Sequence, residues 1–220
     1  MRNSPPSSGL AALALVAWAS AAPSAHRLDE YLQAARLAIE PHRVELVLDL
    51  TPGTAVAERV IAEIDRDRDR SISAEEGRAY AQQVVGALVV DIDGRPLRLT
   101  LIDNEFPAID AMMTGIGTVR LRAQASLPAL NGGRHHLHYR NTHQPSGSVY
   151  LANALMPSND RVAVTSQHRD VDQRELTIDY TLRGENATLL GGVVMIGIGA
   201  ALGCLAVIRR RSSIAQAPSH

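Results

Sequence analysis

The stretch Val119-Arg120-Leu121-Arg122-Ala123-Gln124-Ala125-Ser126-Leu127 carries the clearest structural pattern of this chain. Apolar residues recur at every second position, and polar residues such as Arg120, Arg122 and Gln124 stand between them. Successive side chains of a β-strand point to opposite faces. The pattern therefore predicts a strand with one face in a core and the other in solvent.

The same alternation recurs on both sides of this stretch. It is found in Arg43–Leu50, Leu88–Ile92, Leu97–Leu101, Leu137–Tyr139, Val149–Leu151, Val162–Val164 and Leu176–Leu182. An Asp93-Gly94 turn predicts a hairpin between the second and third of these. Short alternating strands with turn signals between them indicate a mainly β protein, an antiparallel immunoglobulin-like β-sandwich.

Residues 54–88 interrupt the strand pattern with two stretches of helical period. Thr54–Ile64 follows a Pro52-Gly53 break and places apolar residues three and four positions apart. Ser73-Ala74-Glu75-Glu76 reads as a capping box that begins a second helix, which we expect to continue to about Leu88. The sequence thus predicts a helix-loop-helix inserted between two strands.

The loop between these helices, Asp65-Arg66-Asp67-Arg68-Asp69-Arg70-Ser71-Ile72-Ser73-Ala74-Glu75-Glu76, is acidic at alternate positions. Carboxylates at the first, third, fifth and twelfth places are the ligand spacing of an EF-hand calcium loop. The predicted Ca²⁺ ligands are the side chains of Asp65, Asp67 and Asp69, the backbone carbonyl of Ser71, Ser73 directly or through water, and both carboxylate oxygens of Glu76.

Three features of this loop weaken the expected affinity. The sixth place, which normally holds Gly because its backbone takes a positive φ, is Arg70. Arg66 and Arg68 stand between the aspartates and oppose their field. Gly77 follows the loop where an apolar anchor is usual. We expect a dissociation constant on the order of 10⁻⁴–10⁻³ M, as in extracellular modules. The alternative is a solvated loop of alternating charge that binds no ion.

The amino-terminal end, residues 1–25, reads as a secretory signal peptide. It has an early Arg2, an apolar run from Leu10 and small residues up to Ala25, and the run is too short to span a membrane. Cleavage after Ala22 and cleavage after Ala25 both fit. We therefore expect residues 26–183 to form an extracytoplasmic domain.

Near the other end, Thr188–Ile208 contains no charged residue and is followed by Arg209-Arg210-Arg211. Such a length spans a bilayer, and the arginines place the tail in the cytoplasm. With residues 184–187 as a linker and 209–220 as the tail, the chain reads as a type I single-pass protein of the cytoplasmic (inner) membrane. Gly192, Gly199 and Gly203 fall on roughly one helical face, which predicts self-association or docking on another membrane helix.

Composition limits the other possibilities. The single cysteine, Cys204, lies inside the predicted span, so no disulfide framework or exported thiol is expected. The formal net charge is −1, with no basic patch outside the tail, which argues against nucleic-acid binding. Because no nucleophile, paired carboxylates or phosphate loop stands in a catalytic context, we expect no enzyme.

Parts of the chain resemble a bacterial family. Ala25–Leu32, Val44–Leu50 and Ile64–Glu76 are similar to the exported amino-terminal region of nickel/cobalt transporter-like permeases. The resemblance continues through Tyr139–His143 and Ser148–Leu151 to Asn153. It implies an exported accessory or sensory module of the kind found with metal permeases. Transport is not implied, because one predicted span stands here in place of a multi-span permease.

Histidines gather in one stretch of the chain. On a strand, His136 and His138 would point to the same face, with His143 or His26 as a third ligand for Ni²⁺, Co²⁺, Cu²⁺ or Zn²⁺. The alternative is that they are outward polar residues of a strand. Two functions follow from these patterns: a membrane-anchored calcium-binding protein with a structural or partner-docking role, or a Ni²⁺/Co²⁺-binding accessory or sensor for a separate permease.

Overall fold

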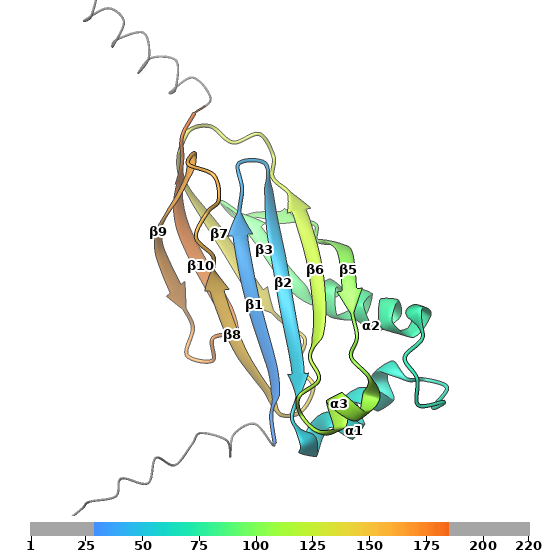
Figure 1. Cartoon of the computed structure of the whole chain (residues 1–220). Helices are drawn as coiled ribbons and strands as arrows, with labels where there is room; N and C mark the ends of the chain where they lie inside the picture. Colours follow the sequence, from blue (N-terminus) through green and yellow to red (C-terminus); the bar gives the residue numbers. More distant parts are fainter. Residues whose placement is uncertain (1–28, 185–220) are drawn as a thin grey trace, which may run out of the picture.

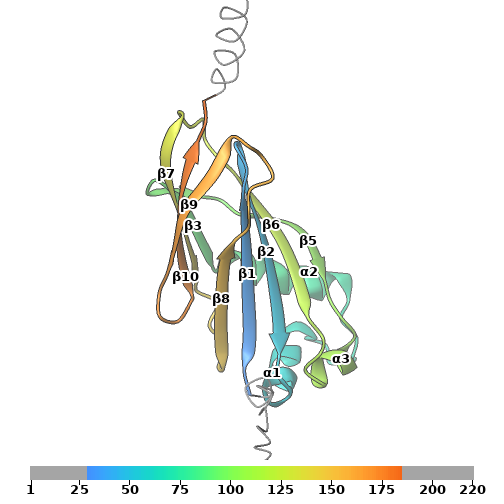
Figure 2. The ribbon, with the colours of Figure 1, turned by 60° about the vertical axis from the view of Figure 1, so that its left-hand side comes forward.

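The computed structural model describes residues 29–184, in which ten β-strands and three α-helices form (Figure 1). The predicted signal peptide at 1–25, the span at 188–208 and the tail at 209–220 lie outside the described residues. Within 29–184, no helix is both long and apolar enough to cross a membrane. The start of β1 and the end of β10 lie at opposite ends of the molecule (Figures 1 and 2).

The chain is mainly β, and its strands form two five-stranded sheets. Sheet A has the order β5-β6-β2-β1-β8, and sheet B has the order β4-β3-β7-β10-β9. Sheet A consists of β1 (Tyr31–Ile39), β2 (Arg43–Pro52), β5 (Thr100–Glu105), β6 (Val119–Ser126) and β8 (Ser148–Ala154). Sheet B consists of β3 (Leu88–Ile92), β4 (Arg95–Leu97), β7 (Gly133–Asn141), β9 (Val162–Arg169) and β10 (Glu175–Leu182).

The alternation that predicted the strands is also the pattern of their burial. Along β2 and β6 every second side chain is buried, and the positions between them, polar except for Val47, are half-buried or exposed. Buried residues of both sheets and of the helices belong to one hydrophobic cluster. We call the two sheets around this shared core the two-sheet body.

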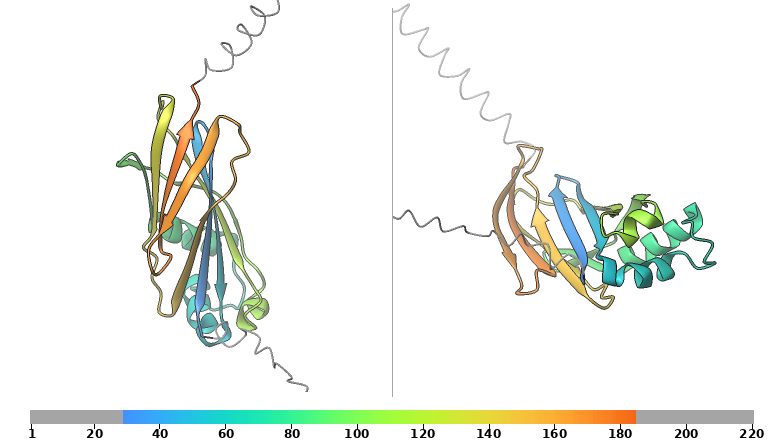
Figure 3. Two further views of the ribbon diagram at one scale, coloured as in Figure 1. Left: turned by 90° about the vertical axis from the view of Figure 1, so that its left-hand side faces the viewer. Right: turned by 60° about the horizontal axis from the view of Figure 1, so that its bottom comes forward.

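Two of the three helices lie where the sequence predicted them, between β2 and β3. They are α1 (Thr54–Ile64) and α2 (Ala74–Gly86), while the short α3 (Ile109–Met113) follows β5. The capping box at Ser73 and Glu76 is confirmed, with both reciprocal hydrogen bonds present. All three helices gather on one side of the strands (Figure 3), where α2 packs against β5 and β3 and α3 packs against α1.

The structure departs from the sequence prediction in several places. β1 and β8 pair in parallel, so the prediction of a wholly antiparallel arrangement is wrong for this pair. The predicted strand Leu97–Leu101 is split: β4 ends at Leu97, and the chain crosses to sheet A as β5. β1 and α3 were not predicted at all.

A pair of buried amides connects the two sheets through the core. Gln33 of β1 and Asn141 of β7 are 1% and 2% exposed, and Asn141 Nδ2 donates to Gln33 Oε1 at 2.8 Å. Gln33 Nε2 donates to the backbone oxygen of His143 at 3.1 Å, and the N–H of His143 donates to Asn141 Oδ1 at 2.9 Å. Because buried polar groups are costly when unpaired, this network fixes how the sheets meet.

Replacing Gln33 by Leu should therefore destabilise the fold. The substitution removes the acceptor of Asn141 and leaves buried polar groups unpaired, at a cost of about 1–3 kcal/mol in the free energy of unfolding. Denaturant unfolding followed by circular dichroism measures this. The matched control Gln124→Leu, on the exposed face of β6, should stay within about 0.5 kcal/mol. Equal losses in the two variants would contradict the bridging role.

Candidate metal centre

The acidic loop lies between the end of α1 and the start of α2, and it projects from the helical side of the molecule (Figure 1). Asp65 is the C-cap of α1, and Ser73 is the N-cap of α2. The two caps fix both ends of the loop. Its acidic side chains are thereby held between two helix termini that the body keeps in place.

Asp65 is the buried member of the loop. Its side chain is 4% exposed, and its Oδ2 accepts the backbone N–H of Arg70 at 3.0 Å, which closes the loop upon itself. Its other oxygen, Oδ1, is buried and has no hydrogen-bond partner. A buried carboxylate oxygen without a donor is unfavourable, and a cation at this position would satisfy it.

Two further carboxylates converge on Asp65. Three carboxylate oxygens lie within 4.8 Å of one another, one each from Asp65, Asp67 and Glu76. This is the one such group of three or more Asp, Glu, His or Cys side chains among residues 29–184. The donor set is all oxygen, which suits a hard divalent cation.

The remaining predicted ligands stand near this group without belonging to it. Asp69 Oδ1 accepts the N–H of Ser71 at 2.7 Å, and Asp67 Oδ1 accepts the N–H of Asp69 at 3.1 Å. Ser73 Oγ donates to Glu76 Oε2 at 2.7 Å. The structure thus brings three of the six predicted ligands together and keeps the other three in the same loop.

The backbone of the loop is strained at two arginines. Arg68 and Arg70 have φ values of 63° and 65°, a left-handed conformation that costs a non-glycine residue roughly 1–2 kcal/mol. A positive φ at Arg70 was predicted from the loop pattern, while that at Arg68 was missed. Arg70 is also the residue whose N–H donates to Asp65 Oδ2.

The convergent carboxylates influence one another's protonation. The hydrogen bond from the N–H of Asp69 lowers the pKa of Asp67, but desolvation and the charges of Asp69 and Glu76 outweigh it, so this pKa lies above its ordinary value. The Ser73 hydroxyl, together with the N–H groups of Ser73 and Arg66, lowers the pKa of Glu76. Crowded carboxylates of this kind favour a bound cation or a bound proton.

The histidines are not brought together. His136 and His138 lie on the outer face of sheet B, and each Nδ1 contacts a different carboxylate: Asp179 at 2.5 Å and Asp91 at 3.1 Å. His143 lies elsewhere, with 8% exposure and its Nε2 3.4 Å from the hydroxyl of Tyr80. His26 lies outside the described residues. No observation in residues 29–184 therefore supports the second metal site.

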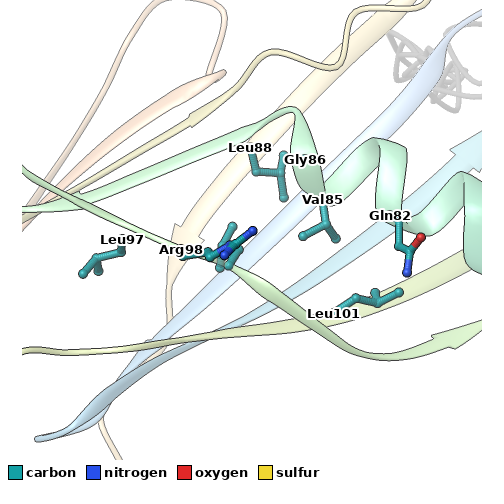
Figure 4. A pocket seen from close by; sticks show the side chains of 8 residues that line it. Gln82, Val85, Gly86, Leu88, Leu97, Arg98 and Leu101 are labelled. Carbon is teal, nitrogen blue, oxygen red and sulfur yellow. The ribbon is translucent and has the colours of Figure 1, made fainter.

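A hollow of about 380 Å³ opens at the far end of α2 from the acidic loop. Gln82 and Val85 of α2 form one wall, with Leu97, Arg98 and Leu101 opposite (Figure 4). Its lining is mostly aliphatic, with Gln82 and Arg98 as the polar exceptions. Neither a nucleophile nor a pair of carboxylates is among the residues that line it.

Comparison with known proteins gives no match to this chain among family models, curated proteins or solved structures. The resemblance to nickel/cobalt transporter-like proteins therefore stays a prediction.

The lowered pKa of Glu76 predicts a pH dependence of stability in calcium-free buffer. A carboxyl group whose pKa is lowered by folding contributes its full stabilisation at pH values above the ordinary pKa of 4.5. That stabilisation is lost as the pH falls through the lower pKa of the folded state. The raised pKa of Asp67 has the opposite effect on stability, because it favours the fold at low pH. Glu76→Gln keeps a capping acceptor but cannot ionise. Its melting temperature should therefore fall less on acidification than that of the wild type.

Melting temperatures measured between about pH 6 and pH 3 check this expectation. Glu75→Gln is the matched control, because Glu75 is the exposed neighbour in the same first turn of α2. It should follow the wild-type profile. A Glu76→Gln profile parallel to the wild type would contradict a stabilising role of this carboxylate.

Proposed function

We propose that the protein is a membrane-anchored, extracytoplasmic calcium-binding protein, in which residues 54–88 form an EF-hand inserted into an immunoglobulin-like β-sandwich. One observation carries the proposal. Asp65 Oδ1 is buried without a partner, and the Asp65 carboxylate has an oxygen within 4.8 Å of oxygens of Asp67 and Glu76. A bound cation is the simplest group that satisfies all three carboxylates.

The chemistry of the donors favours Ca²⁺ over other cations. Zn²⁺, Cu²⁺ and Ni²⁺ favour imidazole or thiolate ligands, and the convergent group contains neither. Mg²⁺ demands near-ideal octahedral geometry and gives up its water reluctantly, whereas Ca²⁺ accepts six to eight oxygens in flexible geometry. A loop with carboxylates at alternate positions and a further Glu at its twelfth place supplies oxygens of that kind.

The residues that would hold the ion are Asp65, Asp67, Asp69, Ser71, Ser73 and Glu76. When bound, Ca²⁺ supplies positive charge that offsets the repulsion among the carboxylates and links the end of α1 to the start of α2. The arginines between the aspartates and the strained backbone at Arg68 and Arg70 keep the affinity modest, with a dissociation constant of about 10⁻⁴–10⁻³ M.

The place of the loop fits a structural ion more than a switching one. Under the predicted topology, residues 26–183 lie outside the cytoplasm, where free Ca²⁺ is not usually pulsed. Strand β10, the last described strand, ends at the end of the body opposite α1 (Figure 2). If 188–208 spans the membrane, the chain leaves for the span from this end of the body, opposite α1.

A calcium titration of the full chain in nanodiscs tests the proposal. Calorimetry should show heat of binding, and Ca²⁺ at ten times its dissociation constant should stabilise the fold by about 1.4 kcal/mol. Asp65→Asn removes the buried charge and should weaken binding by about tenfold or more. Mg²⁺ at the same concentration should give a smaller shift in melting temperature.

The control is Asp172→Asn, which changes an exposed carboxylate remote from the loop and should titrate like the wild type. The absence of both heat and a thermal shift at several times 10⁻³ M Ca²⁺ would overturn the proposal. Equal binding by wild type and Asp65→Asn would also overturn it.

A further inference from the structure

The segment between β5 and β6, residues 106–117, crosses the helical pair, and we call it the strap. Its first residue, Phe106, packs against α2. The rings of Phe106 and Tyr80 meet edge to face with their centroids 6.3 Å apart. Phe106 is half-buried and belongs to the residues packed against the core.

The contact of Phe106 with α2 depends on Gly77. A Cβ atom placed at Gly77 would lie 3.0 Å from both Cδ2 and Cε2 of Phe106, closer than ordinary van der Waals contact. Gly77 stands where an apolar anchor usually follows an EF-hand loop. The ring of Phe106 takes the place of that missing side chain, so the anchor comes from a distant part of the chain.

The middle of the strap packs against α1. α3 contacts α1 and β2, and Met112 of α3 is fully buried. After α3 the chain turns back tightly: Gly117 donates its N–H to the oxygen of Ala111 at 2.7 Å, and a Cβ at Gly117 would lie only 2.6 Å from the nitrogen of Met112. Gly115, at a φ of 74°, lies against Thr54 at the start of α1.

The strap also reaches the acidic loop. Arg70, Ser71 and Ile72 of the loop and residues 106–110 of the strap line the same hollow, of about 470 Å³. Arg70 and Asp110 face each other across it at 3.9 Å, as an exposed and therefore weak ion pair. The strap thus contacts α1, α2 and the loop between them.

We infer that the strap is the built-in target of the helical pair. Calcium-binding helix pairs can offer an apolar surface to a partner. Here Phe106 and Met112 of the same chain fill that surface. This inference rests on the proposed calcium function and deepens it. Calcium would then tighten a helical pair that is already engaged. It would not open a groove for an external protein.

Hydrogen exchange of the full chain in nanodiscs, measured with and without saturating Ca²⁺, tests the inference. In the wild type, Ca²⁺ should slow amide exchange in residues 106–117 by about tenfold, because the strap and the loop open together. In Phe106→Ala, Ca²⁺ should still bind, but strap exchange should be fast and insensitive to it. Ile102→Ala, which shortens a side chain of β5 that is 55% exposed, should behave like the wild type.

Faster strap exchange on adding Ca²⁺ to the wild type would overturn the inference, because it would mean that calcium releases the strap. Unchanged calcium protection in Phe106→Ala would also overturn it. A wild type that shows no calcium heat overturns the proposed function instead, so the two failures are distinguishable.

A second set of variants needs no calcium. Gly77→Ala should lower the melting temperature of the wild type, because the new methyl group crowds Phe106. In the Phe106→Ala background the same change should raise it, because Ala favours a helix over Gly once the ring is absent. The same sign of shift in both backgrounds would contradict the contact.

Discussion

The buried carboxylate of Asp65 is the constraint on which the helical insertion depends. Asp65 ends α1 and holds the N–H of Arg70 with one oxygen, so the loop cannot relax without uncovering a buried charge. Its other oxygen lacks a donor in a place that water does not reach. A buried carboxylate oxygen without a donor is unfavourable, and the cation proposed for this loop would satisfy it.

Helix α2 links the acidic loop to the core of the two-sheet body. The capping box sets the start of α2. One turn after Glu76, the Tyr80 hydroxyl meets that of Tyr31 in β1 at 2.7 Å. Burial raises the pKa of Tyr80 to about 12, so the pair stays neutral and hydrogen-bonded. His143 completes this contact next to the amides that bridge the sheets. An ion bound at the loop would thus stabilise a helix tied to the core of both sheets.

Local patterns were predictable from the sequence, and long-range ones were not. β6 shows strict alternation because its outward residues are polar. β1 lacks this signal, since its outward face includes Leu32, Ala34 and Ala38 while Gln33 points into the core. The acidic loop was found because its ligands are neighbours in sequence. The burial of Asp65 and its unpaired oxygen depend on the tertiary structure.

The role of Phe106 also depends on a long-range contact that the sequence did not predict. Gly77 looked like a missing anchor, and the residue that fills its place is almost thirty positions away in the chain. The sequence predicted His143 as a ligand beside His136 and His138 because it follows them closely in the chain. The chain leaves β7 after Asn141 and turns into the interior. The imidazole of His143 is therefore buried against Tyr80, on the other side of the sheet from His136 and His138.

The most direct test of the central claim is a crystal structure of the protein grown with Ca²⁺, with the ion identified by its anomalous scattering. We predict an ion about 2.3–2.6 Å from Asp65 Oδ1, with oxygens of Asp67 and Glu76 in the same coordination shell. A calcium-grown structure in which Asp65 Oδ1 accepts a hydrogen bond from water or from a protein donor, with no ion among the three carboxylates, would contradict it.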